Sequence, residues 1–128
     1  MIEGLNKLLA KGMDSPELRF GLGKGYLEQG DSGQAIVHLS ACVAQKADYS
    51  AGWKLLGKAY LQQGDRARAA SAWRTGIDVA ERRGDKQASK EMAIFLKRLQ
   101  KAAAPADAAS NEVGGAEAGF TDADPTEG

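Results

Sequence analysis

Residues 53–60, which read Trp-Lys-Leu-Leu-Gly-Lys-Ala-Tyr, decide the fold. Trp53, Leu56 and Tyr60 follow one another at intervals of three and four residues, the spacing of one face of an α-helix. Gly57 stands inside this helix, where glycine costs about 1 kcal/mol relative to alanine. Because glycine has no Cβ, we expect a second helix to cross closely at this position.

The next residues predict that second helix. Gly64 suits the left-handed position after a helix end, and Asp65 can cap the start of a new helix. Ala69 and Trp73 are four residues apart and therefore share one face of it. Together the two segments predict an antiparallel helical hairpin.

The same pattern occurs once more, 34 residues earlier in the chain. Residues 16–49 and 50–83 are therefore predicted to be two copies of one hairpin. Nine residues of the first copy are identical to those of the second at this offset: Leu22, Gly23, Lys24, Tyr26, Leu27, Gln29, Gly30, Asp31 and Ala35.

The pattern Trp-x-x-Leu-Gly-x-x-Tyr with this period resembles the tetratricopeptide repeat (TPR). The resemblance implies an all-α fold, a solenoid of antiparallel helical hairpins that binds other polypeptides. The first copy departs from the family pattern, since Arg19 stands where tryptophan is common.

Two helical segments flank the two repeats. Residues 1–13 are predicted to hold a short amphipathic helix that Gly12 ends and that docks on the first repeat, or else occupies the groove or pairs with another chain. Asp14, Pro16 and Glu17 have the spacing of a helix start with a capping box. Residues 85–102 carry an apolar stripe and a lysine-rich remainder, which is typical of a capping helix. The predicted TPR domain thus spans 14–102.

Residues 103–128 form an acidic tail that we expect to be disordered, because alanine, glycine and polar residues dominate it. It contains six acidic residues and no basic one, so residues 1–102 carry 17 positive and 11 negative charges, a net charge of +6. A basic amphipathic surface that binds nucleic acid or membrane is the least favoured interpretation of that charge.

Compartment and chemistry are constrained mainly by what is missing. A single cysteine, Cys42, allows no disulfide within the chain, and we see no signal peptide or membrane-spanning stretch, so a cytoplasmic protein is expected. Residues 21–25, Gly-Leu-Gly-Lys-Gly, lack the spacing of a phosphate-binding loop. His38 and Cys42 are two candidate metal ligands, fewer than a zinc site needs. We therefore expect no enzyme activity, cofactor or metal.

The resemblance also implies a binding surface, because the first helix of each TPR hairpin lines a concave groove. Three lysines with apolar residues between them are suited to an acidic peptide, although lysines that are merely solvated explain the pattern equally well. The carboxylate clamp of some family members adds asparagines, which are absent at these positions. The predicted groove residues are Phe20, Lys24, Leu27, Lys54, Lys58 and Leu61.

The sequence thus predicts a non-enzymatic adaptor that binds a peptide segment of a partner protein. Because two repeats are fewer than the roughly three usually needed, a self-associating module that forms a weak homodimer is the alternative. Binding of nucleic acid or membrane is not expected. Sedimentation at several concentrations separates the first two functions.

Overall fold

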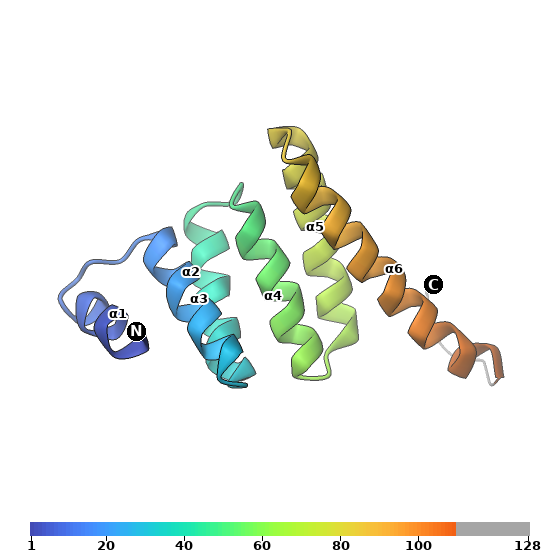
Figure 1. Ribbon diagram of the computed structural model, residues 1–128, viewed down its shortest axis with the longest axis horizontal. Helices are drawn as coiled ribbons and strands as arrows, with labels where there is room; N and C mark the ends of the chain where they lie inside the picture. The colour runs from blue at the N-terminus through green and yellow to red at the C-terminus, as the bar shows by residue number, and fades with distance from the viewer. Residues whose placement is uncertain (110–128) are drawn as a thin grey trace. The chain divides into compact units, whose positions relative to one another are not determined.

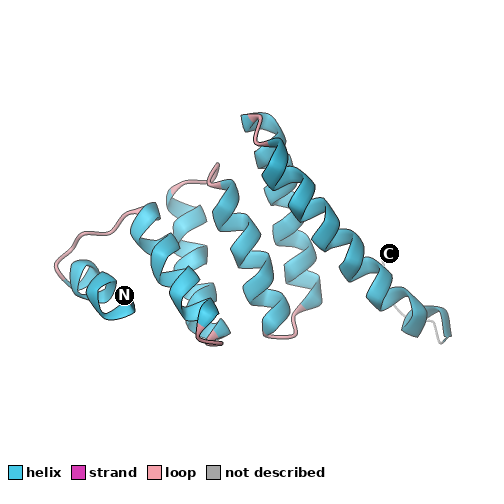
Figure 2. Cartoon of the chain, viewed as in Figure 1, coloured by secondary structure: helices cyan, strands magenta, loops and turns pink. Residues whose placement is uncertain are grey.

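The computed structural model describes the backbone of residues 1–109 and the side chains of residues 1–102. Helices and connecting loops make up this part of the chain (Figures 1 and 2). The chain divides into two units, residues 1–95 and the chain from Leu96 onward. The helices are α1 (Ile2–Ala10), α2 (Pro16–Glu28), α3 (Ser32–Gln45), α4 (Ser50–Gln62), α5 (Arg66–Arg83) and α6 (Lys86–Ala109), which confirms the predicted all-α fold.

In each predicted hairpin, the two helices come closest at a glycine of the first helix. A Cβ added to Gly57 of α4 would overlap the ring of Trp73 on α5, and a Cβ on Gly23 of α2 would overlap Leu39 on α3. The Trp73 ring is fixed there by an indole N–H that donates to the Lys54 carbonyl at 3.1 Å. The two hairpins therefore use the same close crossing, with α2 on α3 and α4 on α5.

The Gly-Asp turns have the predicted geometry. Gly64 has a φ of +89°, in the left-handed region, and the Asp65 carboxylate accepts a hydrogen bond from the Arg68 N–H at 3.0 Å. The same arrangement recurs at Gly30-Asp31 and Gly84-Asp85. One dipeptide thus ends one helix and caps the next three times along the chain.

The core of residues 1–95 runs through both hairpins. Leu39 and Val43 of α3 pack with Leu56 and Ala59 of α4, so the second helix of one hairpin packs against the first helix of the next. Met92, which is fully buried, continues this core onto the start of α6. There it lies where a Cβ on Gly76 of α5 would be.

The helix α1 docks on the first repeat, as the sequence favours. It packs against α2, on the side away from α4 (Figure 1). A Cβ on Gly21 would lie 3.0 Å from Leu5, and one on Gly25 would lie 2.7 Å from Ile2. Gly21 and Gly25, which the second repeat replaces with Leu55 and Ala59, therefore form the surface on which α1 packs, called here the seat of α1.

Two predicted helix ends differ from the structure. The cap of α2 is Ser15, whose hydroxyl accepts from the Leu18 N–H at 3.1 Å, so the predicted capping box of Asp14 and Glu17 is wrong. The helix α6 continues to Ala109 instead of ending at 102, because residues 102–109 are mostly alanine, the strongest helix former. The rest of the predicted tail, residues 110–128, lies outside the described residues.

Among the helices that the structure describes, none combines the length and the apolar character needed to cross a membrane.

Candidate functional site

The six predicted groove residues lie on two neighbouring helices. Phe20, Lys24 and Leu27 belong to α2, and the other three, Lys54, Lys58 and Leu61, belong to α4, which contacts α2. Lys24 and Lys58 are exposed, and Leu61 is 40% exposed. Phe20 and Leu27 are half-buried against the core. The chain thus presents cationic side chains beside partly buried apolar ones.

Lys54 already binds a carboxylate of its own chain. Its ammonium group lies 2.9 Å from the carboxylate of Glu91, near the start of α6, and both side chains are partly exposed. The hydrogen bond from Lys54 lowers the pKa of Glu91 below its usual range. This lysine is therefore engaged with α6, an outcome that periodicity and spacing do not reveal.

Lys58 contacts the same helix, α6, at the aromatic ring of Phe95. Its ammonium group lies 4.8 Å from the centroid of the Phe95 ring, within the range of a cation–π interaction. Phe95 in turn packs against Trp73, with ring centroids 5.4 Å apart. Glu91 and Phe95 thus belong to the same surface as the two lysines. Phe95 stands out in the sequence as part of the apolar stripe, whereas Glu91 carries no such signal.

A second polar cluster lies at the first repeat, where Arg19 replaces the common tryptophan. The Arg19 guanidinium holds the Asp14 carboxylate with two hydrogen bonds, at 2.8 and 2.9 Å. Gln45 donates to the same carboxylate at 2.9 Å. These hydrogen bonds lower the pKa of Asp14 to about 2. Asp14 therefore ties α2 to the end of α3 instead of capping α2.

Arg19 also reaches His38 of α3, at 3.2 Å from Nδ1. Because a guanidinium can only donate, Nδ1 must be the accepting nitrogen and carries no proton. Burial lowers the pKa of His38, and the neighbouring Arg19 charge lowers it further. The imidazole stacks on Tyr26, with centroids 5.5 Å apart and planes 5° apart. His38 is thus a neutral, buried ring.

Cys42 is a fully buried thiol whose pKa rises to about 11, chiefly through burial. Cys42 packs against Gly52 of α4, where an added Cβ would lie 3.1 Å from the Cys42 sulfur. Within the part of the chain that the structure describes, no group of three or more His, Cys, Asp and Glu side chains could hold a metal ion.

Comparison with known proteins places the chain in a family. No protein-family model matches it. The TPR repeat-containing protein PA0015 of Pseudomonas aeruginosa (strain PAO1) is 59% identical over 102 residues, which cover 80% of this chain and 97% of the relative. The solution structure of protein BPP2914 from Bordetella parapertussis is 41% identical, with a TM-score of 0.76, and the match covers 88% of this chain and 97% of that one. With this identity, the 34-residue repeat and the paired helices, the chain belongs to the TPR repeat-containing proteins.

Proposed function

We propose that the chain binds an acidic peptide segment of a partner protein on the surface formed by the six predicted groove residues. Membership of the TPR repeat-containing proteins implies a protein–protein interaction module, a class that is typically not catalytic. The finer proposal concerns the site and the chemistry of the partner. The cations are Lys24, Lys54 and Lys58, and the apolar contacts are Phe20, Leu27 and Leu61.

The observation that carries the proposal is the ion pair between Lys54 and Glu91. A carboxylate of the chain itself is held at 2.9 Å on this surface, beside an exposed lysine that lies over an aromatic ring. A glutamate or aspartate of a partner would find the same ammonium group and the same neighbouring apolar side chains. The pair thus supports a carboxylate as the recognised group.

Exchange of Glu91 for a partner's carboxylate would cost little. A surface ion pair contributes about 0–1 kcal/mol, because water screens it and two long side chains must be ordered. Lys24 and Lys58 are more exposed than Lys54, so they would meet the partner first. Selectivity would then come from the apolar side chains between them.

Capture from native lysate tests the proposal. The full chain is compared with the double variant Lys24→Gln and Lys58→Gln, and bound proteins are quantified by mass spectrometry. Lys7→Gln with Lys11→Gln is the matched control, because it removes the same charge from exposed positions in and beside α1. We expect a partner that the chain and the control capture equally and that the groove variant loses.

Equal capture by all three proteins would refute the surface proposed here. Sedimentation velocity at several concentrations accompanies the capture. A dimer that the groove variant abolishes would make a second copy of the chain the occupant of this surface and would replace the peptide proposal.

A further inference from the structure

The two repeats differ at one interior position in a way that leaves a pocket in the second. Residues 34 apart are equivalent, so His38 of the first repeat corresponds to Ala72 of the second, and Tyr26 corresponds to Tyr60. In the first repeat the His38 ring is 6% exposed and lies parallel to Tyr26. In the second repeat a methyl group stands where this imidazole would be.

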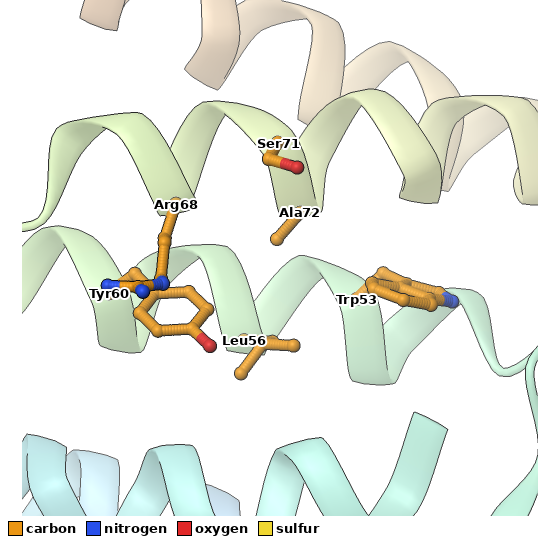
Figure 3. Close-up of a pocket in the computed structure, with 6 residues that line it drawn as sticks. All are labelled: Trp53, Leu56, Tyr60, Arg68, Ser71 and Ala72. Carbon is orange, nitrogen blue, oxygen red and sulfur yellow. The ribbon is translucent and has the colours of Figure 1, made fainter. Parts of the chain in front are cut away.

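A pocket of about 250 Å³ lies at this position (Figure 3). Its floor is formed by Leu56 and Ala72, which are 4% and 5% exposed. Arg68 and Ser71 are exposed, and Figure 3 shows Arg68 extending from α5 toward Tyr60 of α4. We call it the Trp53–Tyr60 pocket. Its lining residues are Trp53, Leu56, Tyr60, Arg68, Ser71 and Ala72.

The aromatic side chains of the pocket are held in place before any ligand arrives. The Trp53 indole N–H donates to the Ala47 carbonyl at 2.8 Å, which fixes the orientation of that ring. Tyr60 packs against the core on its inner side. A fixed aromatic wall lowers the ordering cost of binding, which is the general advantage of a preorganised site.

We propose that the Trp53–Tyr60 pocket binds one planar side chain of a partner protein. This side chain is aromatic, the imidazole of histidine included, and acidic residues stand next to it in the partner's sequence. The first repeat shows the occupant that this framework accepts, since its own His38 ring is stacked on the equivalent tyrosine. The inference does not depend on the groove, because none of the six groove residues lines this pocket.

The volume fits a single ring. Pockets for drug-sized ligands have volumes of about 300–1,000 Å³, so this pocket is too small for most of them. A cavity of about 150 Å³ is enough to hold benzene. Stacked or tilted aromatic pairs contribute interaction free energy beyond that expected from the area they bury. An aromatic ring therefore gains more binding free energy from Tyr60 than an aliphatic side chain would.

The charge at the pocket favours carboxylates beside the ring. Within the part of the chain whose side chains are described, Arg68 pairs with Asp65 at 2.7 Å, in an exposed ion pair within one helix turn. A guanidinium has five N–H donors, so it can donate hydrogen bonds to a second carboxylate while it keeps those to the first. In the first repeat the equivalent residue is the neutral Gln34, which makes Arg68 a feature of the open pocket alone.

Nuclear magnetic resonance of the full chain tests the inference with two synthetic probes. One is the acetylated and amidated tripeptide Asp-Tyr-Asp, and the other is the same peptide with alanine in place of tyrosine. The chain contains two tryptophans, so the indole N–H signals supply an internal control. Trp53 lines the pocket, whereas Trp73 is 1% exposed and does not line it. We expect the tyrosine probe to shift the Trp53 signal saturably and to leave Trp73 unmoved.

Two variants, each taken from the first repeat, sharpen the test. Ala72→His supplies the ring of the first repeat and should abolish the Trp53 response. Arg68→Gln leaves the pocket open and should weaken the tyrosine probe several-fold without abolishing it. If Ala72→His does not fold, Ala72→Val fills part of the same space and should weaken the probe.

Three results would overturn the inference: no Trp53 shift at the highest soluble probe concentration, an equal shift with the alanine probe, or an unchanged shift in folded Ala72→His. Equal affinity of Arg68→Gln and the unmodified chain would overturn the role of the flanking carboxylates.

Discussion

Glycines at helix crossings are the residues on which the packing of each hairpin depends. Gly57 is buried, and the atoms that a Cβ would meet belong to the rigid ring of Trp73, which is 1% exposed and cannot turn away. Gly4, in α1, has the opposite setting, since among the described residues no side chain beyond its two chain neighbours lies within 4 Å of an added Cβ. The same residue type is thus required at one position and merely tolerated at the other.

We predict that Gly57→Leu lowers the free energy of unfolding by about 1–3 kcal/mol, the usual cost of overpacking a core. Gly4→Ala should raise it by about 0.5–1 kcal/mol, since alanine loses less entropy in a helix. Urea denaturation followed by circular dichroism measures both. An unchanged midpoint for Gly57→Leu would show that the two helices do not cross at this glycine.

His38 makes stability depend on pH. Its pKa in the folded chain is lower than the value of 6.5 expected in the unfolded chain, because burial and the Arg19 charge disfavour the imidazolium. The unfolded chain therefore binds the proton more readily, and stability falls as the pH drops through 6.5. Asp14 acts at lower pH, since its pKa of about 2 lies below its ordinary value of 3.8 and its contribution is lost between the two.

The corresponding experiment compares the chain with His38→Gln. We expect the unmodified chain to lose more stability between about pH 7.5 and 5.5 than the variant does, because only it carries the titrating imidazole. Urea denaturation at both pH values measures the difference. The carboxylates are common to both proteins and cancel. Equal losses would contradict the lowered pKa of His38 in the folded chain.

At the scale of elements, repetition made most of the fold predictable. The 34-residue offset fixes the four hairpin helices, and the Gly-Asp pairs fix three of their ends, because each dipeptide combines a left-handed residue with a cap. Helix ends without such a pair were less predictable. Ser15 and Asp14 are both good caps, and in the structure Asp14 accepts hydrogen bonds from Arg19 and Gln45 while Ser15 caps α2.

The candidate site was less predictable than the fold. The sequence places the six groove residues on the first helix of each hairpin, since spacing along a helix determines its faces. It does not reveal that Lys54 meets Glu91, because that pair joins residues 37 apart on different helices. The seat of α1 did carry a signal, as Gly21 and Gly25 are one helix turn apart and face the same way.

The docking of α1 can be tested at this seat. We predict that Gly25→Val displaces α1, because the new side chain would occupy the space of Ile2. A helix of nine residues is not stable alone in water, so the amides of α1 should lose their protection from hydrogen exchange. Protection in α4 and α5 should persist.

Lys24→Val is the matched control, since it puts the same β-branched residue at an exposed neighbouring position of α2. Retained protection of α1 in Gly25→Val would show that α1 holds its place by other contacts. Equal loss of protection in the control would show that valine weakens α2 in general.

At the scale of the whole molecule, one carboxylate of the chain is held by a lysine in a part of the sequence that is basic overall. Residues 1–102 carry a net charge of +6, and Glu91 occupies one lysine of the proposed groove. In the proposed function Glu91 competes with the partner for Lys54. Under this proposal, removal of the Glu91 charge should change the binding of an acidic partner and leave the free energy of unfolding nearly unchanged, because a surface ion pair contributes little to stability.

The most direct test of the proposed function is the dissociation constant of the captured partner segment, measured by isothermal titration calorimetry with Glu91→Gln, with Lys58→Gln and with the unmodified chain. Glu91→Gln should bind several-fold more tightly, because Lys54 is released, and Lys58→Gln should bind several-fold more weakly. The same dissociation constant for all three proteins would contradict carboxylate recognition on this surface.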